Sequence, residues 1–282
     1  MKLGSEEHKA LFCRSFIDTH LKYEPETLPW PKLDRVSLER LRAIPFWKEA
    51  LYKERNAGMM VNAFAETMGD PLLREAVTLQ GREEVRHARL VEFLVNHYGI
   101  KVSEPEAEDL PRNIETAFID FGFGECLDSF FAFGLFAIAR QAQYLPQPFF
   151  TIFDPILYEE ARHIVFFINW VTYLQIQQGR RLAIFRAAHS LWYYSRALRI
   201  LIKAFRGSGE REEEGFAVSG ANTFMDDLTA KLFISTCLAE NAKRMGQFDP
   251  HLLQPRFIPG LSKLALGVLK RLPRRQPKPA AQ

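Results

Sequence analysis

The residues best suited to chemistry are two copies of one five-residue pattern, Glu83-Glu84-Val85-Arg86-His87 and Glu159-Glu160-Ala161-Arg162-His163. Each copy contains a Glu-x-x-His step, and residues three apart lie on the same face of a helix. A carboxylate and an imidazole placed in this way can bind one metal ion together. A single step arises easily by chance, whereas two copies that share the flanking Glu and Arg indicate a site for two metal ions. The alternative interpretation is a solvated helix face held by salt bridges.

The helices that carry these motifs need partners that supply further carboxylates. Residues 69–71, Gly-Asp-Pro, are expected to end one helix that starts after Pro45 and to cap the next, which runs to about residue 97. Glu84 lies about 15 residues after this turn, so the antiparallel residue at the same height, about 22 Å along the hairpin, is Glu54. Glu49 and Glu66 lie farther from that height and are weaker candidates.

The second motif needs an equivalent carboxylate on a long helix that we expect from Pro111 to about residue 145. Glu125 is the only glutamate between residues 116 and 158, with Asp128 one turn later as the fallback. Glu125 lies in an apolar, Phe-rich stretch, where a carboxylate is costly to bury unless a metal, an arginine or a proton accompanies it. A buried Glu–Arg pair is the alternative to a metal ligand here.

The rest of the pattern predicts an all-α fold. Asp154-Pro155 is interpreted as a helix cap that opens a helix to about residue 178, and the intervening 146–153 segment either runs back alongside its neighbour or is itself partly helical. Further helices are expected at about 5–20, 182–206 and 219–245, and no alternating strand pattern appears. We expect one domain over residues 1–260, with a metal-binding bundle over 46–178 and accessory helices after 178. We expect residues 261–282 to form a basic amphipathic or disordered tail.

Composition indicates the size of the core, the role of the cysteines and the cellular location. The 282 residues are 47% hydrophobic and carry a net charge of +3, which suits one sizeable core. The three cysteines have no paired spacing, which argues against a disulfide framework or a thiolate zinc site. The N-terminus lacks an export pattern, so we expect a cytoplasmic location, with membrane association as the alternative.

The arrangement resembles the ferritin-like di-iron carboxylate proteins, in which a Glu from each of two helices joins a Glu-x-x-His from each of the other two. The doubled Glu-Glu-x-Arg-His is most similar to the oxygen-activating branch of that superfamily. The resemblance implies a ferritin-like four-helix bundle with additional N- and C-terminal helices. It also implies two iron ions, with manganese or a mixed Mn/Fe pair as the alternative. Carried over by position, the metal ligands are Glu54 and His87 at one ion, Glu125 and His163 at the other, and Glu84 and Glu160 bridging the two.

The same resemblance assigns roles to the neighbours of these ligands. Glu83 and Glu159 are expected to orient the His of the opposite helix, because metal-bound His usually donates its other ring N–H to a carboxylate. Arg86 and Arg162 are expected to neutralise these two acids. Ser129 occupies a position where related oxygenases often carry a hydroxyl for proton delivery, and it is the one candidate catalytic side chain.

These expectations lead to an oxygen-dependent non-haem di-iron oxidase or oxygenase of hydroxylase, desaturase or N-oxygenase type. The phenylalanines around Glu125 favour an apolar substrate, free or bound to a carrier protein, although most of them are expected to be ordinary core. Without a Cys-x-x-Cys pair, electrons would come from a ferredoxin or a separate reductase. The alternatives are a metal- or peroxide-handling protein of ferroxidase or manganese-catalase type, and a non-catalytic lipid- or partner-binding scaffold.

A basic, aromatic region follows the second motif. No acidic residue occurs between Glu160 and Glu210, while arginines alternate with Phe, Trp and Tyr. In the tail, Leu261, Leu264 and Val268 fall on one helical stripe beside lysines and arginines. The basic C-terminal region suits peripheral membrane contact or the docking of an acidic carrier protein. The alternative is a merely solvated face. A homodimer is left open, and nucleic acid is disfavoured but kept open.

Overall fold

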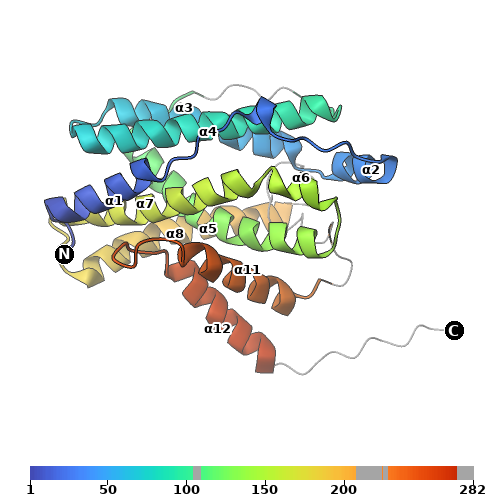
Figure 1. The fold of residues 1–282 in the computed structure, drawn as a ribbon. Helices are drawn as coiled ribbons and strands as arrows, with labels where there is room; N and C mark the ends of the chain where they lie inside the picture. Colours follow the sequence, from blue (N-terminus) through green and yellow to red (C-terminus); the bar gives the residue numbers. More distant parts are fainter. Residues whose placement is uncertain (104–108, 208–223, 225–227, 272–282) are drawn as a thin grey trace.

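All regular structure in the described residues, 1–103, 109–207, 224 and 228–271, is helical in the computed structural model, which confirms the all-α class (Figure 1). The prediction of a helical hairpin followed by two further long helices is met. The helices are α1 (Glu6–Asp18), α2 (Arg35–Ala43), α3 (Trp47–Glu66), α4 (Pro71–His97), α5 (Ile114–Gln141), α6 (Gln147–Thr151), α7 (Asp154–Gln177), α8 (Ala183–Gly207), α11 (Ala230–Met245) and α12 (Phe257–Arg271), and a 3-10 turn, η1, covers Pro25–Thr27.

Helix α4, which forms a hairpin with α3, begins with the cap that the sequence predicts. The side chain of Asp70 accepts hydrogen bonds from the backbone N–H groups of Leu72 and Leu73, and Pro71 occupies the first turn of α4. The two helices approach closely at Gly81, where an added Cβ would lie only 2.4 Å from Oδ1 of Asn62. This close antiparallel packing brings the middle of α3 next to the first Glu-x-x-His step on α4.

Helix α5 forms the centre of the fold, packed against α3, α7, α8 and α11. It is the helix, within the described part of the chain, that is long and apolar enough to cross a membrane by length and composition. However, 56% of its most apolar 18-residue stretch is buried inside the fold. Core helices of soluble proteins can have the same length and apolar composition. Its packing against α3, α7, α8 and α11 favours the core interpretation.

Helix α1 covers the seam between α4 and α7, as Figure 1 shows. Its N-cap is Ser5, whose hydroxyl accepts a hydrogen bond from the backbone N–H of His8. Phe12 and Phe16 of α1 are buried in the same apolar cluster as Phe166 of α7. The chain N-terminal to the bundle is therefore part of the core rather than an appendage.

Several boundaries differ from the sequence-based expectation. Helix α2 is absent from that expectation, whereas the segment after residue 145 is partly helical, as α6, which is one of its two expected alternatives. Asp154 is not the N-cap of α7, because Phe153 holds that position without a side-chain bond and Asp154 instead accepts a hydrogen bond from Arg140 at 2.7 Å. Helix α12 starts at Phe257, so the expected tail boundary at 261 falls inside a helix.

Two of the expectations fall partly on residues outside the described ranges. Of the helix expected over 219–245, residues 219–223 and 225–227 lie outside them, and α11 covers 230–245. Of the tail, residues 272–282 lie outside them.

Candidate metal centre

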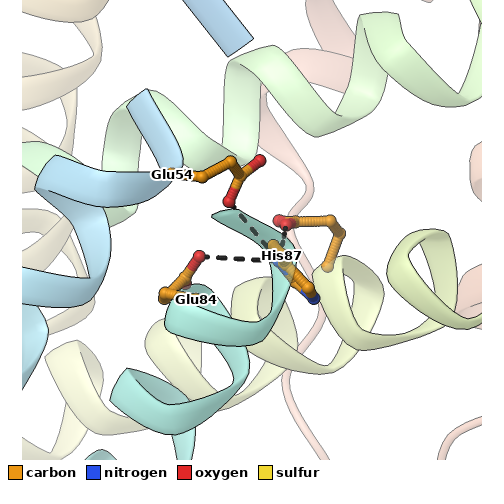
Figure 2. Close-up of side chains that lie close together, drawn as sticks. Glu54, Glu84 and His87 are labelled. Atoms are coloured by element: carbon orange, nitrogen blue, oxygen red, sulfur yellow. Dashed lines mark ion pairs between the residues drawn. The ribbon is translucent and has the colours of Figure 1, made fainter. Parts of the chain in front are cut away.

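The two Glu-x-x-His steps face each other from α4 and α7 across the interior of the bundle. The ring centroids of His87 and His163 are 5.7 Å apart. Around Nδ1 of His87 lie three carboxylate oxygens, from Glu54 at 3.5 Å, Glu84 at 3.7 Å and Glu160 at 3.2 Å. Figure 2 shows Glu54 reaching from α3 toward Glu84 and His87 of α4. Ligand atoms of these four residues lie within 4.8 Å of one another, so the cluster could hold a metal ion.

A second set of contacts surrounds His163. Its Nδ1 atom lies 3.1 Å from Oε1 of Glu84 and 3.8 Å from Oε2 of Glu160. Glu84 and Glu160 therefore each direct one oxygen toward His87 and the other toward His163. A carboxylate that bridges two metal ions needs this placement, and two such carboxylates make the cluster compatible with a di-iron site.

The imidazole nitrogens give an independent test of whether a metal fits. Nδ1 of His87 and Nδ1 of His163 are both buried and have no hydrogen-bond partner. Buried polar atoms in folded proteins nearly always have a partner, so two such atoms facing the same carboxylates call for an explanation. Metal coordination supplies one, because neutral imidazole binds a metal through the nitrogen that carries no proton.

The other imidazole nitrogens are held by glutamates from the opposite helix. Nε2 of His87 lies 2.9 Å from Oε2 of Glu159, and Nε2 of His163 lies 2.8 Å from Oε2 of Glu83. Each carboxylate therefore accepts the Nε2–H, so Nδ1 is the nitrogen that would be free of a proton in a metal-bound imidazole. Glu83 and Glu159 each contact the His of the opposite helix, so the two motifs depend on each other.

Arginines lie beside both of these glutamates. Arg162 donates from Nη1 to Oε1 of Glu83 at 2.7 Å, and Arg86 donates to Oε1 of Glu159. Burial by itself would raise the pKa of Glu83, but the hydrogen bond from His163 and the charge of Arg162 lower that pKa to about 2. Glu83 is therefore an ionised carboxylate in the interior of the bundle.

Glu125, on α5, lies next to the cluster, although the structure gives no short contact between Glu125 and His163. Burial raises its pKa well above the ordinary value, and the negative charges of Glu160 and Glu84 raise it further. Glu125 is not one of the four residues whose ligand atoms lie within 4.8 Å of one another, so its role as a metal ligand stays a prediction. Asp128, the fallback, instead pairs with the half-exposed Lys53 at 3.2 Å.

The pKa values of Glu54, beside His87, and of His163 are both raised, but for different reasons. Burial raises the pKa of Glu54 to about 7, despite the opposing charge of His87. For His163, burial lowers the pKa, but the charge of Glu84 and the hydrogen bond to Glu83 raise it to about 10. Without metal, protons on these groups offset the charge of the clustered carboxylates, and metal ions would take their place.

Sequence reasoning missed the contribution of the segment that follows α1. Nδ1 of His20 lies 2.6 Å from Oε1 of Glu83, and the hydroxyl of Tyr23 donates to Oε2 of Glu159 at 2.9 Å. Thr19 accepts a hydrogen bond from Nε of Arg162 at 2.9 Å. No local pattern signals these contacts, because they depend on α1 lying across α4 and α7.

The remaining predicted residues have less specific surroundings. The hydroxyl of Ser129 is 3.5 Å from Oε2 of Glu160, which places it beside the cluster at the limit of hydrogen bonding. Phe118, Phe130 and Phe133 are fully buried members of the main apolar cluster. Their core role is the one expected for most phenylalanines, and the apolar substrate cavity stays a prediction.

Comparisons of the chain with protein-family models, with curated proteins and with solved structures gave no match. The class of protein is therefore defined by the structure itself, as a helical bundle with a buried carboxylate–histidine cluster that could bind metal.

Proposed function

We propose that this protein is a ferritin-like di-iron carboxylate enzyme that uses dioxygen to oxidise a mostly apolar substrate. The observation that supports the proposal best is the pair of buried, unpartnered Nδ1 atoms of His87 and His163, which face Glu84 and Glu160 from opposite sides. A solvated salt-bridging face, the main alternative for the two motifs, does not fit groups that are at most 13% exposed in their side chains.

Six residues would bind the two metal ions. Glu54 and His87 would hold one ion, Glu125 and His163 the other, and Glu84 and Glu160 would bridge them. Iron at this site would supply the redox chemistry of oxygen activation. Manganese or a mixed pair would satisfy the same donor set.

The chain's own groups would orient the ligands and handle protons around them. Glu159 and Glu83 keep the Nε2–H of each imidazole directed away from the cluster, so that Nδ1 stays available. Ser129 would hold a proton beside Oε2 of Glu160. The surrounding phenylalanines of α5 would exclude water from the site and favour an apolar substrate.

The function also implies partners outside the chain. The cysteines at 13, 126 and 237 are free and buried, so they provide no thiolate site for a second redox centre. A ferredoxin or reductase would therefore deliver electrons, and the substrate would arrive as a small molecule or on a carrier protein.

Metal content tests the proposal first. Protein reconstituted anaerobically with ferrous iron and freed of excess metal should retain about two irons per chain, as a di-iron carboxylate site requires. His163→Ala should retain about one, because one of the two sets of ligands loses its imidazole. His97→Ala is the matched control, since His97 also lies on a bundle helix but is exposed and stacks on Phe93. Wild-type protein that binds no iron would refute the proposal in favour of a non-catalytic scaffold.

Oxygen consumption then separates the enzymatic alternatives. The iron-loaded, reduced protein should consume dioxygen faster when an apolar substrate such as a long-chain acid or an arylamine is present, with an oxidised product detected by mass spectrometry. Rapid ferrous oxidation that is indifferent to every added substrate would instead indicate a ferroxidase, and peroxide disproportionation by the manganese form would indicate a catalase.

A further inference from the structure

Helix α8 is poorly covered by the rest of the fold. It packs on α5, where Tyr193 stacks on Phe123 and the buried Tyr194 meets the same ring edge-on. Elsewhere its large apolar side chains are exposed, with 72% of Ile184 and 58% of Trp192 accessible. The exposed apolar residues at its start and along its length are Leu182, Ile184, Phe185, Leu191, Trp192, Ile200 and Ile202.

The spacing of these side chains concentrates them on one side of the helix. Phe185 and Trp192 are seven residues apart, as are Ile184 and Leu191, so the two pairs form adjacent stripes two turns long. Contiguous apolar surface that includes aromatic residues marks an interaction site rather than ordinary exposed surface.

The charged residues of α8 itself have one sign. No acidic residue occurs between positions 160 and 210, and arginines lie at 180, 181, 186, 196 and 199. Arg196 pairs with Asp120 of α5 at 3.1 Å, whereas no ion pair within the described ranges involves Arg181 or Arg199. The guanidinium of Arg199 lies 5.9 Å from the ring centroid of Trp192, so cation and aromatic ring share one surface.

A second exposed helix adjoins the first. Phe257, at the start of α12, stacks on Tyr194 of α8 with ring centroids 4.6 Å apart. From there α12 projects away from the bundle (Figure 1). It also lacks acidic residues and exposes Leu261, Leu264 and Val268, next to Lys263, Lys270 and Arg271.

We propose that α8, with α12 beside it, docks the protein onto an anionic lipid membrane. Trp and Phe at the centre of an apolar stripe flanked by arginines are suited to the boundary between headgroups and acyl chains. The arginines would contact lipid phosphates, which supply the negative charge that α8 and α12 lack. A second copy of the chain fits less well, because a two-fold contact would place this basic patch against itself.

Vesicle flotation tests the proposal with the full chain, with and without metal. The protein should float with vesicles of phosphatidylcholine and phosphatidylglycerol, and should stay behind with phosphatidylcholine alone. High salt should weaken the binding, because it screens the attraction. The binding needs no metal, so its failure would leave the proposed enzymatic function untouched, and the reverse also holds.

Tryptophan fluorescence locates the contact. Trp47 and Trp170 are buried, Trp30 is partly buried, and Trp192 is the exposed one. Anionic vesicles should shift the emission of the wild type to the blue and protect it from acrylamide. Trp192→Phe should keep the flotation and lose the shift, which would place the lipid at this helix.

Two pairs of substitutions measure the contributions. Arg181→Ser combined with Arg199→Ser should weaken binding about 25-fold, at about fivefold for each charge near the membrane surface. Arg35→Ser combined with Arg82→Ser is the control, because it changes the net charge equally at exposed positions on α2 and α4.

Phe185→Ser combined with Trp192→Ser should abolish the flotation, whereas Val36→Ser with Leu110→Ser, which removes exposed apolar side chains elsewhere, should not. Two results would overturn the proposal. One is a failure of the wild-type protein to bind anionic vesicles, or of the substitutions to weaken its flotation. The other is a dimer in solution that the Phe185→Ser, Trp192→Ser protein no longer forms, which would make this face a contact between copies.

Discussion

Glu83→Gln is the substitution that tests the interdependence of the two motifs most directly. The Glu83 side chain is completely buried and accepts hydrogen bonds from Arg162 at 2.7 Å and from His163 at 2.8 Å. The amide has nearly the shape of the carboxylate, so the change removes charge while leaving the packing intact. Arg162, itself 1% exposed, would then be a buried cation without its anion.

The expected loss of stability follows from these contacts. Removing one partner of a buried ion pair costs about 3–5 kcal/mol. Arg162 keeps its hydrogen bonds to Thr19 and to the carbonyl of Phe16, and it lies over the Phe16 ring at 4.3 Å, so we expect the lower end, about 3 kcal/mol. The pKa of Glu83 leads to the same magnitude, since a change from 4.5 unfolded to about 2 folded corresponds to about 3 kcal/mol.

Metal binding should change as well. In the Glu83→Gln protein, the new side-chain amide nitrogen would face Nε2 of His163 and favour the tautomer that carries its proton on Nδ1, the atom aimed at the cluster. We therefore expect a 10–100-fold loss of metal affinity at the His163 side, by about the magnitude seen when such orienting carboxylates are removed.

Urea unfolding of the metal-free protein measures the first effect, and metal analysis after dialysis measures the second. The free energy contributed by the ionised Glu83 should be present above pH 4.5 and be lost as the pH falls toward 2, a dependence that the variant should lack. Glu26→Gln is the control, because it breaks an exposed pair with Arg89 worth at most about 1 kcal/mol. A Glu83→Gln protein within about 1 kcal/mol of wild type that retains full metal would contradict the reasoning.

Three further outcomes are expected. Metal affinity, measured by competition titration, should rise from pH 6 to pH 8 because Glu54, with a pKa of about 7, must lose its proton to bind; an affinity independent of pH would contradict this. Gly122→Ala should destabilise the fold by about 1–3 kcal/mol in thermal or urea unfolding, since the new Cβ would lie 2.2 Å from the ring of Phe167, whereas Gly124→Ala, which meets nothing within 4 Å, should be neutral or stabilising. Asp70→Ala should cost about 1–2 kcal/mol through loss of the α4 N-cap and of the ion pair with Lys9 at 2.5 Å, and an unchanged unfolding midpoint would show that neither contact stabilises the fold.

Local signals were sufficient for much of the fold. Ser5 and Asp70 form the caps that their residue types predict, because capping depends on a side chain and the backbone two or three residues later. The same type of signal failed at Asp154, where Arg140 from the end of the preceding long helix takes the carboxylate. A cap prediction fails when a distant cation competes for the same oxygen.

Helix α2 shows a second limit of local reasoning. Asp34 caps it through a hydrogen bond to the backbone of Ser37, yet the helix is short and polar, and only Ser37 and Leu41 are buried. Helices this short gain most of their stability from tertiary packing, so periodicity alone does not indicate them.

The amino-acid sequence by itself determined the helical class, the hairpin register that sets Glu54 opposite the first motif, and the types of ligand available, because each depends on spacing along one or two adjacent helices. Only the tertiary structure decided that Glu83 reaches His163 and Glu159 reaches His87, that His20 and Tyr23 complete this shell, and that α8 is left uncovered. These features depend on how helices distant in sequence cross, and crossing geometry follows from the packing of whole helix faces rather than from any short pattern.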